Sequence, residues 1–163
     1  MDILVATAKL AEGTVRKAVG SKAHTIVLDI EIAAFITPRR LLEALKDQQL
    51  QEHYDIIFVP GLVSGDFSRV AEELGTKIYL GPKHAYDLGY VLDFVGKIEF
   101  STKVPACELL ADVRKKLALE KVEQLEASCE PLMWIKDLKL GGGSRMKILA
   151  EIVDATGMET TAL

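Results

Sequence analysis

The sequence has 163 residues, of which 49% are hydrophobic and 27% are charged, a composition that allows one full core and is ordinary for a soluble protein. A formal net charge of −4 argues against the basic surface of a nucleic-acid-binding protein and against binding to anionic membranes. No run reaches the roughly 18 apolar residues of a membrane span, and Met1 and Asp2 lead into a strand pattern instead of a signal peptide. We therefore expect a cytoplasmic protein that binds neither nucleic acid nor membranes.

The first part of the sequence alternates apolar runs with amphipathic segments. Strands are predicted at residues 2–6 and 25–28, and each is followed by a helix. Thr37 and Pro38 are typical of the N-cap and the first residue of the second helix.

The most apolar run, at residues 56–59, predicts the central strand of the sheet. Its four consecutive core residues leave no polar face, so the strand should be covered on both sides. In the loop that follows, Gly61 and Gly65 permit a close approach or positive φ, and Asp66 can cap the next helix.

The remaining part of the pattern continues the alternation. A fourth strand at 78–80 runs into a helix that is predicted to start at Pro82 and to end at Gly96. A weaker fifth strand at 97–100 precedes a long helix from about Pro105 to Ser128.

Five strand-helix units predict an α/β fold. We expect a three-layer sandwich with a mostly parallel five-stranded sheet, either flavodoxin-like or Rossmann-like, over residues 1–130. The strand orders 2-1-3-4-5 and 3-2-1-4-5 both remain open.

Residues 131–163 differ in character and predict a β-hairpin after the α/β domain. The alternation of Trp134–Leu140 is followed by the turn residues Gly141–Gly143 and by a second alternating run, Met146–Val153. No helix covers this hairpin, so the chain is expected to be part of a larger protein.

Candidate ligand-binding residues lie in the loops after the strands, which open on one edge of a parallel sheet. They are Lys9, Thr37, Gly61, Ser64, Gly65, Asp66, Lys83, His84, Asp87 and Thr102. Ser64, Gly65 and the amides at the start of the third helix can hold an anion, with Lys9 and Lys83 adding positive charge. For Thr37 and Asp66, helix capping alone is the alternative.

His84 is predicted to lie near the N-terminus of the fourth helix, where the helix dipole disfavours protonation. A ligand or catalytic role and a packed or solvated residue are both open. Cys107 and Cys129 have no C-x-x-C spacing, so no metal site is expected. The P-loop and dinucleotide-binding motifs are absent, and no cofactor is evident.

Six stretches resemble the amino-terminal region of the dihydropteroate synthase-like proteins of archaea and of bacteria with methanopterin-type carriers. They are T-A-K-L-A-E from Thr7, A-A-F-I-T-P from Ala33, P-G-L-V-S-G-D from Pro60, G-P-K-H-A-Y-D-L from Gly81, S-T-K-V-P-A from Ser101 and L-A-E-I-V-D-A from Leu149. In that family such a domain precedes a barrel similar to dihydropteroate synthase, which joins a hydroxymethyl-pterin diphosphate to an aminobenzoate-type amine. The resemblance implies that residues 134–153 are the hairpin and first strand of that barrel. Glu151 and Asp154 are the candidates from this strand, without an assigned role.

Three functions follow as hypotheses. The first is an accessory domain of pterin biosynthesis that binds a small anionic, phosphorylated or pterin-related ligand. The second is a non-catalytic domain that docks on the barrel of the parent protein or forms a homodimer. The third is an independent enzyme with His84 and Asp66 as acid-base groups. The fragment alone is not expected to catalyse pterin condensation, and no catalytic residue is assigned.

Overall fold

The computed structural model describes residues 1–50 and 54–148. The chain divides into two compact units, residues 1–113 and the residues from Arg114 onward. This division falls within a long helix, and the predicted boundary between residues 130 and 131 lies just after the end of the same helix.

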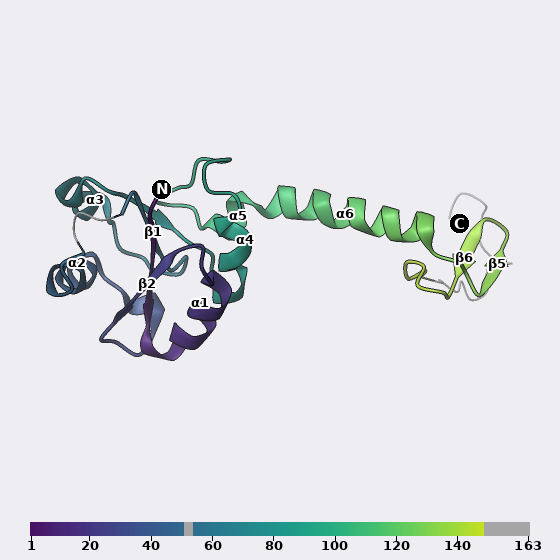
Figure 1. The fold of residues 1–163 in the computed structure, drawn as a ribbon. Coiled ribbons are helices and arrows are strands. Elements are labelled where there is room, and N and C mark those ends of the chain that lie inside the picture. Colours follow the sequence, from purple (N-terminus) through teal and green to yellow (C-terminus); the bar gives the residue numbers. More distant parts are fainter. Residues whose placement is uncertain (51–53, 149–163) are drawn as a thin grey trace, which may run out of the picture. The chain divides into compact units, whose positions relative to one another are not determined.

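A parallel sheet forms the centre of the first unit (Figure 1). Its strands are β1 (Ile3–Ala8), β2 (His24–Leu28), β3 (Ile56–Val59) and β4 (Lys77–Leu80), in the order β2-β1-β3-β4. All residues of β1 and β3 are buried, as predicted for β3, because side chains from helices cover both faces. The α/β class is confirmed, and the order agrees with the beginning of 2-1-3-4-5 and not with 3-2-1-4-5.

Helices lie on both faces of this sheet (Figure 1). They are η1 (Lys9–Ala11), α1 (Glu12–Val19), η2 (Ala33–Phe35), α2 (Pro38–Asp47), α3 (Ser68–Leu74), η3 (Ala85–Asp87), α4 (Leu88–Leu92) and α5 (Ala106–Leu109), where η marks a 3₁₀ helix. Leu41 of α2 and Val70 of α3 pack on one face together with Ile57. Val15 of α1 and Val91 of α4 pack on the other face. The sheet is therefore the middle layer of three.

The predicted fifth strand at residues 97–100 is not part of the described sheet. A single bridge joins Val95 to Ile98, and the amide of Leu80 in β4 donates to the carbonyl of Ser101 at 2.9 Å. Gly96 has a φ of 81°, and the amides of Lys97 and Ile98 donate back to Phe94. These turn bonds hold the backbone away from a continuous ladder, so the five-stranded count was wrong for the part of the chain that the structure describes.

The helix predicted from Pro82 begins later, with η3 at Ala85 and α4 at Leu88. The amide of Gly81 donates to Val59 at 2.7 Å and that of Gly61 donates to the carbonyl of Pro82 at 3.1 Å. Because these bonds hold the backbone after β4 against the end of β3, no helix can form until the chain leaves this contact. His84 therefore has an extended backbone before η3, and its predicted position inside a helix was wrong.

The long helix predicted from Pro105 to Ser128 is interrupted. Pro105 precedes α5, and Leu110 leaves the helical conformation before α6 (Ala111–Ser128) begins.

In the second unit a hairpin follows the end of α6. The antiparallel strands β5 (Met133–Ile135) and β6 (Leu138–Leu140) pair so that Lys136 and Asp137 form the turn. A hairpin is present as predicted, but with other strands and another turn. Lys136 and Asp137 divide the predicted first strand, Trp134–Leu140, into the two strands of the hairpin, and Gly141–Gly143 follow β6 instead of joining two strands. In the predicted second run, Met146–Val153, residues 146–148 are not in a strand, and residues 149–153, together with Glu151 and Asp154, lie outside the described residues.

The glycines instead allow the chain to pass closely over the segment before β5. All three have positive φ, and a Cβ atom at Gly142 would lie 1.8 Å from the carbonyl oxygen of Glu130. Only glycine can make this approach.

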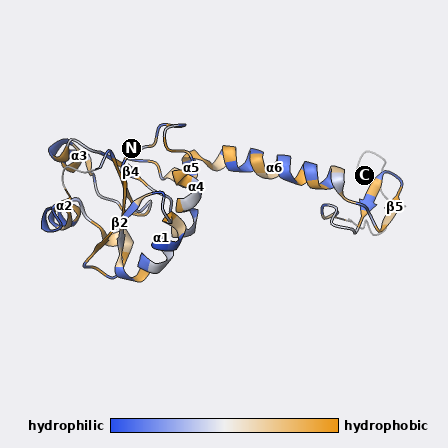
Figure 2. Cartoon of the chain, in the orientation of Figure 1, coloured by the Kyte–Doolittle hydropathy of each residue, from blue (hydrophilic) through white to orange (hydrophobic). Residues whose placement is uncertain are grey.

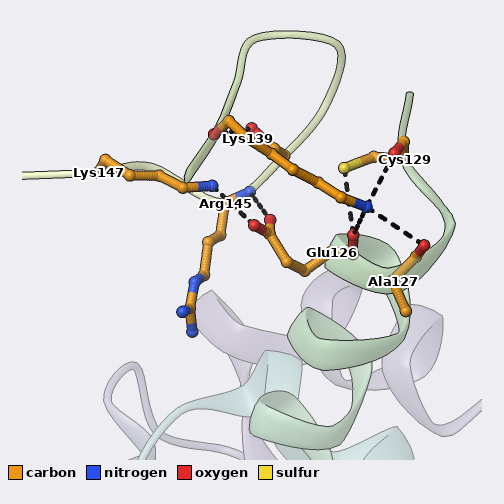
Figure 3. A network of polar contacts seen from close by, with 7 residues as sticks. Glu126, Ala127, Cys129, Lys139, Arg145 and Lys147 are labelled. Carbon is orange, nitrogen blue, oxygen red and sulfur yellow. Dashed lines mark hydrogen bonds and ion pairs between the residues drawn. The ribbon is translucent and has the colours of Figure 1, made fainter. Parts of the chain in front are cut away.

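Polar contacts tie the hairpin to the end of α6 (Figure 3). The ammonium of Lys139 donates to the carbonyls of Glu126 at 2.7 Å and Cys129 at 3.2 Å, which satisfies carbonyls left open at a helix C-terminus. The carboxylate of Glu126 accepts from Lys147 at 2.8 Å and from the amide of Arg145 at 2.7 Å. The pKa of Glu126 is lowered, mainly by the hydrogen bond from Lys147 and also by that from the amide of Arg145.

Candidate functional site

A cavity of about 150 Å³ lies where β1, β3 and β4 end. This is the switch point of the sheet: β1 lies in the middle, β2 was added on one side of it, and β3 and β4 follow on the other side. Ligands of open α/β sheets bind at such a switch point, outside the carboxyl ends of the strands. Residues of α1, η2, η3 and the loops after β3 and β4 complete its walls.

The walls are mostly apolar or small. Val5, Val15, Phe58 and Leu88 belong to the buried core, and η2 contributes small side chains such as that of Ala33. A cavity of this composition excludes charged groups from its interior and accepts apolar ones.

Thr7 is the exception in this wall. It is 1% exposed, and its hydroxyl has no hydrogen-bond partner among the described residues. Because side chains alternate along a strand, Thr7 lies on the same face as Val5, toward the side of the sheet where Phe58 and Val15 pack. An unpaired buried hydroxyl costs about 1–3 kcal/mol, so this position carries a stability penalty.

Lys83 lines the cavity and is half-exposed. Its ammonium lies 2.6 Å from Oε1 of Glu108, and the hydrogen bond and charge of that carboxylate raise the pKa of Lys83. Its amide also lies 3.5 Å from Sγ of Cys107. The positive charge expected at this edge is therefore present but paired.

Lys9 is paired as well. Its ammonium contacts the carboxylate of Asp29 and lies 3.7 Å from that of Glu31. The hydrogen bond and charge of Asp29 raise the pKa of Lys9, and the same contact lowers the pKa of Asp29. Lys9 thus joins the chain after β1 to the chain after β2 and does not line the cavity.

Thr37 is the N-cap of α2, and Asp66 lies just before the N-cap of α3, Phe67, and bonds to the first residue of that helix. The hydroxyl of Thr37 accepts from the amide of Arg40 at 3.3 Å. The carboxylate of Asp66 accepts from the hydroxyl of Ser68 at 2.6 Å and from its amide at 3.0 Å, and these bonds lower the pKa of Asp66. Because Asp66 already takes the first amide of α3, this helix start does not provide the predicted anion site.

The two glycines of the loop after β3 serve close packing. A Cβ atom at Gly61 would lie 2.4 Å from the carbonyl oxygen of Gly81, and one at Gly65 would lie 2.8 Å from the ring of Pro38. Gly61 thus lets the segment after β3 approach the segment after β4 beside the cavity. Gly65 lets the same loop pack against Pro38 at the start of α2.

The remaining predicted site residues do not line the cavity. Ser64, His84 and Thr102 are exposed, and Asp87 lies in η3. Asp66 is engaged by Ser68, and neither Asp66 nor His84, the predicted acid-base groups, lines the cavity.

The cavity lies at the edge of the sheet where the ligand-binding loops were predicted, but most of its wall is formed by residues that were not predicted. Thr7 had a usable signal, since it is the polar residue of an otherwise apolar run and strand alternation turns it inward with Val5. The first residues of four of the six quoted stretches, those that start at Thr7, Ala33, Pro60 and Gly81, all line the cavity.

A second, wider depression of about 870 Å³ lies at the amino ends of β1, β3 and β4. Two of its polar groups are paired: the amide of Asp2 donates to Asp55 at 2.7 Å, and the buried hydroxyl of Thr76 donates to the carbonyl of Tyr54 at 3.0 Å. It therefore lacks the unpaired group that distinguishes the smaller cavity.

Residues 1–50 and 54–148 contain neither a side-chain cluster suited to a metal ion nor a membrane-spanning helix. No group of three or more His, Cys, Asp or Glu side chains there is placed to hold a metal ion. Nor does this part of the chain contain a helix with the length and apolarity needed to cross a membrane.

Comparisons with known proteins add one relative. The chain is 35% identical, over 175 aligned residues that take in all of it, to an uncharacterized protein of Methanocaldococcus jannaschii. The match takes in 33% of that protein, so the chain spans about a third of the length of the curated relative it matches. No protein-family model matches the chain. No solved structure matches it either.

Proposed function

We propose that residues 1–113 bind a small molecule over the ends of β1, β3 and β4, with an apolar part of the ligand in the cavity. The observation that carries this proposal is the cavity at the switch point of the sheet, lined in part by Thr7, whose buried hydroxyl is unpaired among the described residues. Lys83 at the same cavity offers a charged group for a polar end of the ligand, in exchange for its bond to Glu108.

The proposed context is pterin or methanopterin biosynthesis, with this unit as an accessory domain of a dihydropteroate synthase-like protein. This part of the proposal rests on the six stretches that resemble that family. Four of those stretches begin in the cavity wall, which supports a link between the resemblance and a ligand site. The relative in Methanocaldococcus jannaschii has two thirds of its length outside the match, which leaves room for a further domain.

The test is binding to the 163-residue chain, measured by thermal shift and titration calorimetry with 6-hydroxymethylpterin, 4-aminobenzoate and inorganic phosphate. At least one pterin-related compound is expected to raise the melting temperature. Ala34→Leu, which adds side-chain volume at the cavity, should remove that shift, whereas Ala118→Leu on the exposed surface of α6 should not. No stabilisation by any compound, or equal effects of the two substitutions, would contradict the proposal.

A second candidate function is docking, either on the barrel of the parent protein or on another copy of the chain. It is favoured by the apolar side chains that α6 and the hairpin leave exposed. They include Leu117, Leu119, Leu125, Trp134 and Ile135. Orange segments in Figure 2 mark the hydrophobic residues along α6. Light scattering over a range of concentrations tests the homodimer: a constant monomer mass, equal for the chain and for Leu119→Glu, would exclude it.

A further inference from the structure

The volume of the cavity limits what can enter it. A cavity of about 150 Å³ lined by apolar side chains can take up a benzene-sized molecule, whereas pockets that enclose a whole ligand measure about 300–1,000 Å³. The cavity at the ends of β1, β3 and β4 has the smaller volume. It therefore fits one six-membered ring and is too small for a fused bicyclic system.

The charges around the cavity argue against an ionised group in its interior. Lys83 is the charged residue in the described wall, and Glu108 already pairs with its ammonium at 2.6 Å. A carboxylate or phosphate placed among Val5, Val15 and Phe58 would lose its water without gaining an unpaired cation. The buried part of the ligand should be neutral.

The hydroxyl of Thr7 calls for one hydrogen-bonding atom on that neutral group. A bound water needs two to four polar partners to be retained, and the other described wall side chains, apart from Lys83, are apolar or lack polar atoms. A ring substituent satisfies the hydroxyl without a second polar partner. Because a threonine hydroxyl can donate or accept, both a hydroxyl and a carbonyl substituent fit.

We infer that the cavity accepts an uncharged monocyclic ring with one hydrogen-bonding substituent, a phenol-like group. This substituent bonds to the Thr7 hydroxyl, which is covered in the unliganded protein, once a change of side-chain rotamer turns it toward the cavity. Any charged part of the ligand remains outside. This inference rests on the proposed function and names the class of group that the same site selects. A fused pterin ring would then lie over the edge of the sheet and not inside the cavity.

The experiment compares phenol, benzene and benzoate as probes of the full 163-residue chain, by titration calorimetry and by NMR shifts of the Val15 and Ala33 methyl groups. Phenol is expected to bind at least about fivefold more tightly than benzene, because benzene leaves the hydroxyl unpaired. Benzoate is expected to bind more weakly than either. The methyl shifts locate the bound probe in the cavity.

Two substitutions at one position isolate the hydroxyl. Thr7→Val keeps the shape of the side chain, removes no existing hydrogen bond, and should abolish the preference for phenol over benzene. Thr7→Ser keeps the hydroxyl and should keep the preference. Thr76→Val is the matched control, since Thr76 is also buried but bonds to Tyr54 at the opposite edge, and it should leave the preference unchanged.

The outcomes separate this inference from the proposed function. Tighter binding of benzoate than of phenol, or a phenol preference that survives in Thr7→Val, would overturn the inference. If 6-hydroxymethylpterin shifts the cavity methyl groups and all three monocyclic probes fail to do so, the inference is wrong and the proposed function stands. If no probe and no pterin binds, both are wrong.

Discussion

In residues 1–113 both faces of the parallel sheet pack against apolar side chains of helices, whereas α6, most of which belongs to the second unit, has no buried side chain. The strands of the hairpin are likewise largely exposed. What holds the described part of the second unit together is mainly polar: Lys139 on the last carbonyls of α6, and Glu126 with Lys147. The two units thus share one chain and differ in the source of their stability.

The spacing of apolar residues, more than their number, produces this difference. Leu41 and Leu45 of α2 are four positions apart and are both completely buried, because that spacing returns a side chain to the same side of a helix. The spacing of Leu117, Leu119 and Val122 places them on different sides of α6, and all three remain exposed. Because α6 has no single apolar side to bury, other contacts, such as those of Lys139 and Glu126, must help to stabilise it.

Spectroscopy can follow the two units separately, because their aromatic residues differ. The sequence has one tryptophan, Trp134, which lies in the hairpin, and its four tyrosines are Tyr54, Tyr79, Tyr86 and Tyr90. Trp134 fluorescence therefore reports on the second unit, and the tyrosine signal reports on the first.

Phe58→Ala should have the largest effect, and only on the first unit. The ring is completely buried and meets that of Phe100 edge-on, with ring centroids 5.1 Å apart. Its loss leaves a cavity in the core and should cost about 3–5 kcal/mol of the free energy of unfolding. Denaturant titration with tyrosine emission measures this loss, while the Trp134 midpoint should stay in place.

The control for this prediction is Phe35→Ala, which removes a ring that is 65% exposed. It should change the free energy of unfolding by about 0.5 kcal/mol at most. If both phenylalanine variants lost similar stability, the first unit would not be core-stabilised as described.

Gly142→Ala should have the next largest effect, on the second unit. Its φ is +63°, and the added Cβ would meet the carbonyl of Glu130, so we expect a loss of about 2–3 kcal/mol from strain and displaced backbone. Gly143→Ala is the matched control: its φ is +84° but its Cβ would meet no atom within 4 Å, so the loss should be nearer to about 1 kcal/mol. The Trp134 unfolding curve measures both, and equal losses would show that the close approach to Glu130 is not required.

Much of the fold could be predicted from the sequence because it depends on local periodicity. The strand at residues 56–59 and the cap at Thr37 both have a local cause, and each lies where it was expected. The missing fifth strand has a non-local cause, since it depends on whether residues 97–100 can reach the edge of β4. The late start of α4 is similar, because it results from contacts between Gly81, Pro82 and the loop after β3.

The candidate site was predictable only in its position. Parallel strands place all their following loops at one edge, and the cavity lies there. The charge state of that edge was not predictable, because Lys9 and Lys83 are neutralised by Asp29 and Glu108, which belong to other segments. The importance of Thr7 depends on the absence of a partner, which no sequence pattern records.

The smallest predicted effect is a pH dependence confined to the second unit. The carboxylate of Glu126 has a lowered pKa because Lys147 and the amide of Arg145 donate to it. Its contribution to stability is therefore present above the pKa of an unfolded glutamate, about 4.3, and is lost as the pH falls through the lower folded value. Trp134 fluorescence should show a falling denaturation midpoint below about pH 5, whereas Glu126→Gln should lower the midpoint at neutral pH and flatten this dependence. Glu120→Gln, which changes an exposed glutamate of the same helix, should keep the wild-type profile.

Because only 17% of the Lys147 side chain and 23% of the Glu126 side chain are exposed, salt should weaken this pair less than a fully exposed one. A wild-type profile that matches Glu126→Gln would mean that the hairpin is held to α6 by Lys139 alone.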